Sequence, residues 1–126
     1  MMEKPDLQVL DGEFSIHRLS ASARVPGAVM ACPFHWIAHT DEETSIVCPA
    51  SVAVPGARTE TGWSCIRVDG PIDFAVTGLL ADLSRALADV GIAIFALSTF
   101  DTDYLLVPTL RIEDAAAVLR RAGYHI

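Results

Sequence analysis

Two polar stretches in an otherwise apolar part of the chain carry groups that bind small molecules. The first, Asp69-Gly70-Pro71-Ile72-Asp73-Phe74, comes directly before a segment with helical spacing; the second, Ser98-Thr99-Phe100-Asp101-Thr102-Asp103, follows an apolar strand. Free amides at the start of a helix bind carboxylates, and an aspartate binds an ammonium group. If the stretches share one rim of a sheet, they form a pocket for an amino acid. The alternative is a capped helix beside an ordinary turn.

Metal-ligating residue types occur, but their spacing does not favour a metal centre. Cys32-x2-His35-x3-His39 comes nearest to a ligand set. In an extended strand, His35 and His39 lie about 13 Å apart, too far to share an ion whose bonds are about 2 Å long. The pair Asp101 and Asp103 fits a hairpin turn, where aspartates accept hydrogen bonds from nearby amides. We therefore expect neither a metal nor another cofactor.

The cysteines do not predict catalysis. A Cys–His nucleophile needs a thiolate beside its base, and no cysteine stands at a predicted helix start, where the helix dipole lowers a thiol pKa. The odd, scattered set of Cys32, Cys48 and Cys65 predicts buried free thiols rather than a disulfide framework. The glycines are also too far apart to form a phosphate-binding loop. The chain is not expected to be an enzyme.

Composition and charge exclude several other classes of protein. Of 126 residues, 52% are hydrophobic and 20% charged, which predicts a compact domain or two very small ones and excludes disorder. The net charge of −7 repels nucleic-acid phosphates and anionic membranes. Apolar runs stay shorter than the roughly 18 residues of a spanning helix. The start at residues 1–6 lacks an apolar signal core, so a cytoplasmic protein is expected.

The elements that must position the two polar stretches are a helix and two strands. Apolar residues at helical spacing predict a helix over about 74–90, with Asp73 as N-cap and Gly91 as terminator. A strand over 63–68 precedes it. The nearly continuous apolar strand over 92–98 follows, and such strands lie in the middle of a sheet or are covered on both faces.

A strand and a helix complete the second half of the chain, and the first half repeats the same order of elements less regularly. A strand over 104–107 and a helix over 113–122 complete a β-α-β-β-α series in the second half. The first half has the same order of strand, weak helix and hairpin, so it reads as a β-rich, degenerate copy. Its expected elements are strands over 7–10, 14–19, 34–39 and 45–48, a short helix within 21–30 and a connector over 49–62. The expected domains are residues 1–59 and 60–126.

Two segments resemble the tandem ACT domains of the CASTOR/ACT type. The more specific runs from Gly70-Pro71-Ile72-Asp73-Phe74 to Ser98-Thr99-Phe100-Asp101-Thr102-Asp103-Tyr104-Leu105-Leu106-Val107-Pro108. The other is Asp41-Glu42-Glu43-Thr44-Ser45-Ile46-Val47-Cys48-Pro49, where the family usually has Glu-Leu-Ser and this chain has Glu-Thr-Ser. The resemblance is close over 60–124 and more distant over 6–55.

The resemblance implies an α+β fold of two ferredoxin-like βαββαβ modules in tandem, the first degenerate and β-rich. It also implies a non-catalytic regulatory module that holds an amino acid between modules. By position, it assigns ligand binding to Gly70, Ile72, Asp73, Phe74, Gly78, Ser98, Thr99, Phe100 and Asp103. The arginine-sensing relatives carry acidic residues in the first helical turn, whereas the expected first turn here, 74–77, has no carboxylate. A smaller or neutral amino acid therefore fits at least as well.

Three further expectations concern assembly and alternatives. The second module lacks its last strand, which residues 7–10 are expected to supply, from this chain or from a partner chain. Open sheet edges and apolar helix faces associate, so a homodimer is expected. A ligand-independent oligomerisation module with a vestigial pocket is the alternative to an amino-acid sensor.

Overall fold

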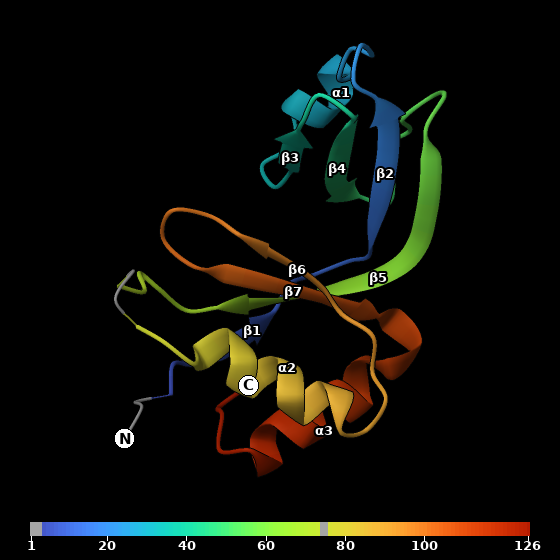
Figure 1. The fold of residues 1–126 in the computed structure, drawn as a ribbon. Helices are drawn as coiled ribbons and strands as arrows, with labels where there is room; N and C mark the ends of the chain where they lie inside the picture. Colours follow the sequence, from blue (N-terminus) through green and yellow to red (C-terminus); the bar gives the residue numbers. More distant parts are fainter. Residues whose placement is uncertain (1–3, 74–75) are drawn as a thin grey trace. The chain divides into compact units, whose positions relative to one another are not determined.

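A computed structural model describes residues 4–73 and 76–126, which leaves Phe74 outside the described residues. The chain divides into two units (Figure 1). Residues 12–63 are called the inner unit, because they lie between the two segments of the other unit in sequence. Residues 1–11 and 64–126 are called the outer unit. Residues 1–11, which the sequence groups with the first half, therefore belong with the second half.

The outer unit is a sheet with two helices on one of its faces (Figure 1). Its strands lie in the order β1-β5-β7-β6. Strand β5 contributes residues to both units, and its part from Ser64 onward belongs to the outer unit. The elements are β1 (Leu7–Val9), β5 (Arg58–Val68), α2 (Leu79–Ala88), β6 (Phe95–Ser98), β7 (Asp103–Pro108), the short 3-10 helix η1 (Thr109–Arg111) and α3 (Ile112–Arg121).

Helical and strand periodicity explain the core of the outer unit. Leu79, Leu83 and Leu87 recur every four residues and line one side of α2, while Leu105 and Val107 alternate along β7. All five side chains are buried in one cluster. Each contributes about 1.5–3 kcal/mol by leaving water. This cluster holds the sheet against its helices.

The N-terminal strand completes the sheet of the outer unit within this chain. Strand β1 runs antiparallel to β5, with Leu7 opposite Val68. The Leu7 amide donates to the carbonyl oxygen of His125 at 2.7 Å, and the Leu10 amide donates to that of Cys65 at 2.9 Å. Of the two sources expected for the missing strand, the structure therefore shows the same chain.

A charged side chain just before β1 contacts α2 and the residues that follow α3. Lys4 Nζ lies 3.5 Å from Asp82 Oδ2 on α2 and 4.9 Å from the ring centre of Tyr124, which follows α3. The Tyr124 hydroxyl donates a hydrogen bond to Asp82, and this bond, with the charge of Lys4, lowers the pKa of Asp82. Burial and the same carboxylate raise the pKa of Tyr124. The Asp82 carboxylate is therefore already bound by Tyr124 and Lys4 of the same unit.

The expected start of the long helix is wrong. Helix α2 begins at Leu79 and not at about residue 74, and its N-cap is Gly78 rather than Asp73. Gly78 has a φ of 84°, and a right-handed helix cannot continue through this left-handed conformation. The expected end is confirmed, because Gly91 has a φ of 72° and the Ile92 amide donates back to the Leu87 carbonyl.

The strand over 92–98 was expected either in the middle of the sheet or covered on both faces, and both expectations are wrong. Strand β6 begins only at Phe95 and lies last in the strand order, next to β7 alone. Within β6 only Leu97 is buried. The continuous buried run belongs to β7, over 105–107. Apolar content alone did not distinguish the edge strand from the central one, because apolar residues such as Phe95 and Ala96 also occupy positions of β6 that are not buried.

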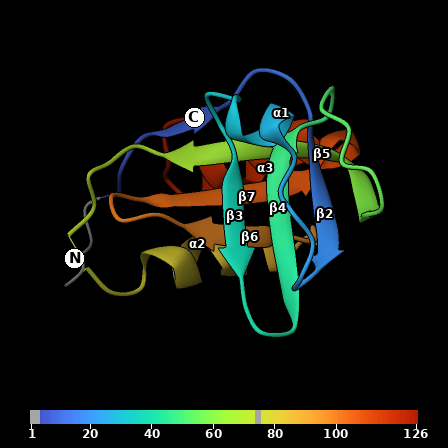
Figure 2. The ribbon, with the colours of Figure 1, turned by 90° about the horizontal axis from the view of Figure 1, so that it is seen from above.

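The inner unit repeats a strand, a helix and a hairpin, and ends with the first part of β5. Its further elements are β2 (Phe14–Ser20), α1 (Gly27–Met30), β3 (Trp36–His39) and β4 (Glu43–Pro49). The strand order is β3-β4-β2-β5, and Figure 2 shows β3, β4 and β2 side by side beneath α1. The expected connector over 49–62 is too long, since β5 begins at Arg58. The core consists of Leu19, Val29, Ile46, Cys48 and Val54.

The cysteines are free thiols, as the sequence predicted. Cys48 and Cys65 are buried, and Cys32 is half-buried. Burial raises the pKa of Cys65 to about 12, so this thiol stays protonated at neutral pH. Among the described residues, no helix is long and apolar enough to cross a membrane.

His17 is buried in the inner unit with one ring nitrogen unpaired. Its side chain is 4% exposed, and Nδ1 lies 2.8 Å from the Thr59 hydroxyl oxygen. Nε2 has no hydrogen-bond partner among the described residues. Register places His17 between Ile46 of β4 and Thr59 of β5, and burial lowers its pKa. The folded protein therefore favours the neutral imidazole.

We expect acid to destabilise the inner unit through His17. Below pH about 6.5 the unfolded chain binds a proton that the folded chain rejects, so the free energy of unfolding falls as pH decreases, until the pH passes the lowered pKa. The slope reaches at most about 1.4 kcal/mol per pH unit. Urea unfolding at pH 7.5 and 5.0 measures it. His17→Gln should flatten the dependence, whereas His39→Gln, at an exposed position, should not; equal slopes for wild type and His17→Gln would contradict this role.

Candidate functional site

The two polar stretches meet at one end of the outer-unit sheet. The Ile72 amide donates to the carbonyl oxygen of Asp101 at 2.7 Å. Gly70 lies so close to the β6–β7 turn that an added Cβ would be 3.0 Å from the Asp101 carbonyl oxygen and from Thr102 Cβ. These contacts bring residues 70–73 and 99–103 side by side, as the pocket hypothesis requires.

A cavity of about 200 Å³ opens between these stretches. Three of its lining residues are apolar, three carry hydroxyl groups and three carry carboxylates. None of the described residues that line it is Lys, Arg or His. The lining residues are Ile72, Asp73, Val76, Ser98, Thr99, Phe100, Asp101, Thr102 and Asp103. The cavity therefore offers an acidic wall and an apolar wall, which fit a cationic group attached to a hydrocarbon part.

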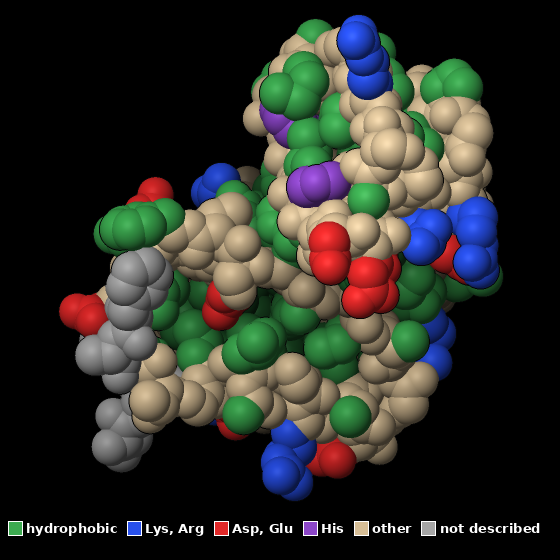
Figure 3. All heavy atoms as spheres, turned by 45° about the horizontal axis from the view of Figure 1, so that its top comes forward, with side chains coloured by type: hydrophobic (Ala, Val, Ile, Leu, Met, Phe, Trp, Pro, Cys, Tyr) green, Lys and Arg blue, Asp and Glu red, His purple; other side chains and the backbone are tan. Residues whose placement is uncertain are grey.

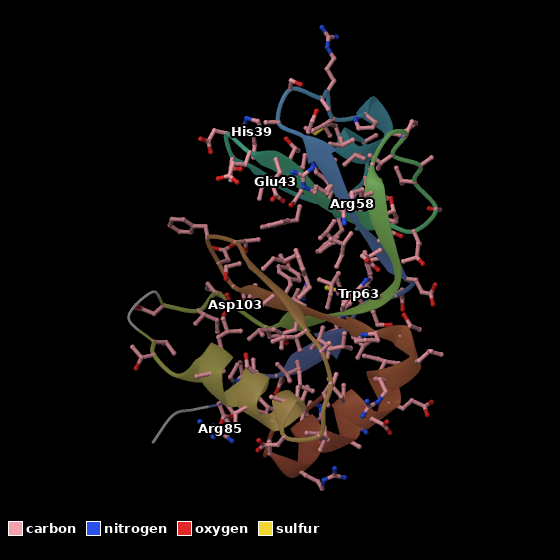
Figure 4. All side chains as sticks on the ribbon, turned by 45° about the vertical axis from the view of Figure 1, so that its right-hand side comes forward. His39, Glu43, Arg58, Trp63, Arg85 and Asp103 are labelled. Atoms are coloured by element: carbon pink, nitrogen blue, oxygen red, sulfur yellow. The ribbon has the colours of Figure 1, made fainter. Side chains whose placement is uncertain are left out.

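Local hydrogen bonds hold the turn that carries the acidic wall. The Thr99 amide donates to the Thr102 carbonyl at 2.8 Å, and the Thr102 amide donates to the Thr99 hydroxyl at 3.3 Å. Ser98 and Asp103 are register partners in the β6–β7 hairpin, and the Ser98 hydroxyl donates to Asp103 Oδ1. Figure 4 shows Asp103 at the turn end of this hairpin. Asp103 is thus held by Ser98 through Oδ1 and is one of the residues that line the cavity.

Two neighbouring cavities share walls with the first. One of about 460 Å³ is also lined by Thr99, Asp101 and Thr102, and adds Arg67 and Tyr104. Arg67 is engaged there, since it lies 3.6 Å from Asp69 Oδ1 and donates to Gln8 at 3.1 Å. A third cavity of about 340 Å³ lies between the segment at 69–73 and Lys4. The β6–β7 turn is thus a common wall of the first two cavities.

The structure assigns different places to the nine residues expected to bind a ligand. Six line the first cavity: Ile72, Asp73, Ser98, Thr99, Phe100 and Asp103. Gly70 lines the second and third cavities and packs against the turn. Gly78 caps α2 and is not part of the lining of the first cavity. Phe74 lies outside the described residues.

Three lining residues were missed from sequence. Asp101 and Thr102 belong to the second polar stretch but not to the nine expected residues, and Val76 lies in the segment predicted to be helical, before the actual start of α2. The run Ser-Thr-Phe-Asp-Thr-Asp contained a signal for Asp101, because Asp101 is a carboxylate within the same polar stretch as Asp103.

The late start of α2 changes the expected chemistry of the cavity. Its free amides belong to the turn that begins at Leu79, so the amides at 70–73 are not those of a helix start. The first turn of α2 contains Asp82, a carboxylate that the expected first turn lacked. Asp82 is bound to Tyr124 and Lys4, however, and does not line the first cavity.

The histidines of the inner unit bind separate partners. His35 Nδ1 lies 2.9 Å from the Cys32 carbonyl oxygen, and His39 Nδ1 lies 2.8 Å from the Thr44 hydroxyl. In the described part of the chain, no three His, Cys, Asp or Glu side chains are grouped to hold a metal ion. On the face seen in Figure 3, Lys and Arg side chains (blue) stand in separate groups among acidic ones (red).

Comparison with known sequences gives partial matches. The cytosolic arginine sensor for mTORC1 subunit 1 from Homo sapiens is 32% identical over 82 residues, which are 64% of this chain and 25% of that protein. The protein of the same name from Rattus norvegicus is 30% identical over 82 residues, covering 64% and 24%. The chain thus spans about a quarter of the length of these curated relatives.

Comparison with solved structures gives matches along nearly the whole chain. Protein Atu0741 from Agrobacterium tumefaciens has a TM-score of 0.89 at 38% identity, covering 98% of this chain and 92% of that one. The ligand-free regulatory subunit of aspartate kinase from Thermus thermophilus has a TM-score of 0.68 at 10% identity, covering 96% and 99%. The second likeness shows the fold alone. The ACT domain family itself matches residues 58–121, which is half of the chain. The chain therefore belongs to the ACT domain family.

Proposed function

We propose that this chain is a regulatory module without catalytic activity that binds an amino acid in the cavity between the β6–β7 turn and the residues Ile72, Asp73 and Val76. The observation that carries the proposal is the contact of Ile72 with Asp101 at the mouth of an acid-walled cavity. Family membership and the arginine-sensor name of the partial relatives support it. Binding would act on a partner by favouring one of two states of the module.

The proposal assigns the ammonium group of the ligand to Asp103. Ser98 holds Oδ1 of this carboxylate, and Oδ2 would bind the ligand. Ile72, Val76 and Phe100 would cover the hydrocarbon part. Charge-assisted hydrogen bonds of this kind are stronger than neutral ones, so Asp103 would contribute most of the affinity.

We further propose that both units are ACT modules in tandem, the inner one degenerate. The strand orders support this. In the order β1-β5-β7-β6, the hairpin of β6 and β7 lies on one side of β5. In the order β3-β4-β2-β5, the hairpin of β3 and β4 lies in the same way on one side of β2, which corresponds to β5. The inner unit has turns over 50–57 where a second helix would stand. A cytoplasmic homodimer that holds the amino acid between modules belongs to the same proposal.

Ligand screening tests the proposed function. Thermal unfolding is followed with each standard amino acid and with polyamines, and hits are titrated by calorimetry. A ligand stabilises the folded state by RT ln(1 + [L]/Kd), so a specific binder raises the unfolding temperature with its concentration. L-Arginine and its neutral isostere L-citrulline form the matched pair for charge. Absence of any response across the set would contradict the proposal.

An oligomerisation module with a vestigial pocket is the second candidate. Strand β6 favours it, since it lies last in the strand order and exposes Ala96 and Ser98. Light scattering separates the candidates. A regulatory binder changes its oligomeric state or its unfolding temperature with an amino acid, whereas a vestigial pocket leaves both unchanged.

We expect Asp103→Asn to weaken amino-acid binding about tenfold or more, because it removes the charge that holds the ammonium group. The loss of stability should be small, since asparagine keeps an oxygen that accepts from Ser98. Calorimetric titration with L-arginine and with the best other hit measures the effect. Asp89→Asn, at the exposed end of α2, is the charge-matched control. Equal affinity in Asp103→Asn would remove Asp103 from the site.

A further inference from the structure

Thr102 differs from the other residues of the β6–β7 turn in its burial. It is 9% exposed, whereas Phe100, two residues before it, is 81% exposed. Its hydroxyl donates a hydrogen bond of 2.6 Å to the carbonyl oxygen of Val68, which is 34 residues away in sequence. The turn that forms the acidic wall is therefore attached at this residue to the last residue of β5.

Val68 is a rigid point of attachment. Its side chain is fully buried in the core of the outer unit, and its backbone pairs with Leu7 of β1. The side chain of Thr102 is therefore bonded to the sheet itself and not to another loop. A turn bonded in this way keeps one position relative to the sheet.

The residues on either side of Thr102 depend on that position. Asp101 offers its carbonyl oxygen to the Ile72 amide at 2.7 Å, and Asp103 offers its carboxylate to the cavity. Gly70 packs against both Asp101 and Thr102. A shift of Thr102 would move the acidic wall and loosen the opposite wall at Ile72 together.

We propose that Thr102 is a positioning residue, whose hydroxyl sets the distance between the two walls of the cavity. The expected effect of Thr102 on ligand affinity rests on the proposed function. Its expected effect on the hydrogen bond between the Ile72 amide and the Asp101 carbonyl does not. Thr102 would touch no ligand charge itself; it would act through Asp101, Asp103 and Ile72.

Three variants test this role. Thr102→Val keeps the shape of the side chain and removes the hydroxyl, while Thr102→Ser keeps the hydroxyl and removes the methyl group. Thr109→Val is the matched control, because the half-buried Thr109 also forms a hydroxyl contact in the outer unit, at 3.0 Å from the buried Ser64, and lines none of the cavities described above. If Thr102→Val does not fold, Thr102→Ala removes the same hydroxyl.

The first readout is hydrogen exchange of the Ile72 amide in the protein without ligand. We expect exchange about tenfold faster in Thr102→Val than in wild type, with wild-type exchange in Thr102→Ser and in Thr109→Val. The second readout is the Kd for L-arginine, which should rise about tenfold in Thr102→Val alone.

The two readouts separate this inference from the proposed function. Unchanged Ile72 exchange in Thr102→Val would overturn the positioning role, whatever the binding result. Wild-type protein that binds no amino acid would overturn the proposed function, and faster Ile72 exchange in Thr102→Val would still support the positioning role. Equal changes in Thr109→Val and Thr102→Val would reveal a merely structural effect and overturn it.

Discussion

Deletion of residues 1–10 is expected to destabilise the outer unit by about 5 kcal/mol. The deletion removes the buried Leu7 side chain, at about 2 kcal/mol. It also removes backbone hydrogen bonds from Leu7 to His125 and from Leu10 to Cys65, together with one from Asp69 to Asp6, at about 1 kcal/mol each. The exposed edge of β5 would in addition favour aggregation. Urea unfolding followed by circular dichroism measures the loss.

Point variants and a peptide make this expectation specific. Leu7→Ala should cost about 2 kcal/mol, because Leu7 is 5% exposed, whereas Gln8→Ala, at the neighbouring exposed position, should cost little. A peptide of residues 4–11 added to the truncated protein should restore stability in proportion to its concentration. An equally stable truncated protein would show that β1 contributes nothing to the sheet.

Gly70→Val is expected to disrupt the cavity and to cost about 2 kcal/mol of stability. Even a Cβ at this position would lie 3.0 Å from the Asp101 carbonyl oxygen and from Thr102 Cβ, and valine adds two methyl groups. Overpacking against backbone forces the neighbouring chain to move. The segment at 70–72 and the β6–β7 turn would separate, and the Ile72–Asp101 hydrogen bond would break. Amino-acid binding should then disappear from calorimetry.

A graded series tests the steric cause. Gly70→Ala should have an effect of the same sign but smaller, since the neighbours need to move only slightly. Gly27→Ala is the control, because an added Cβ there meets nothing within 4 Å, and its effect should stay below about 1 kcal/mol. If Gly70→Val unfolds at the same urea concentration as wild type, the approach of the two segments is looser than the structure has it.

Periodicity predicted the regular parts of the fold well. The alternation from Phe14 to Leu19 and the helical spacing from Glu113 to Ala122 correspond to β2 and α3 within one residue at each end. Such patterns reflect which side of an element is buried, and this is encoded locally. By contrast, the start of α2 depends on a backbone conformation of Gly78 that no apolar spacing reveals.

Long-range pairing set the limit of prediction from sequence. The expectation that residues 7–10 complete the second module is confirmed, but nothing in these residues tells whether the same chain or a partner chain supplies them. For the same reason the edge position of β6 was missed, since its place follows from the pairing of β5 with β7.

The candidate site was predictable as a juxtaposition but not as a list of contacts. Asp73 and Asp103 were expected in it from their segments, and both line the cavity. Thr102 was passed over because a threonine in a turn has no distinctive pattern. Its importance depends on the hydrogen bond to Val68, which joins residues far apart in sequence.

The hydrogen bond between Leu10 and Cys65 bears on how the two units are connected along the chain. Because these residues are hydrogen-bonded neighbours, residues 12–63 leave the outer unit and return to it at nearly the same point. If a tight reverse turn replaced residues 12–63, β1 and the remaining part of β5 would form a continuous hairpin. The chain is thus arranged as one unit with a second unit inserted between its first strand and its second.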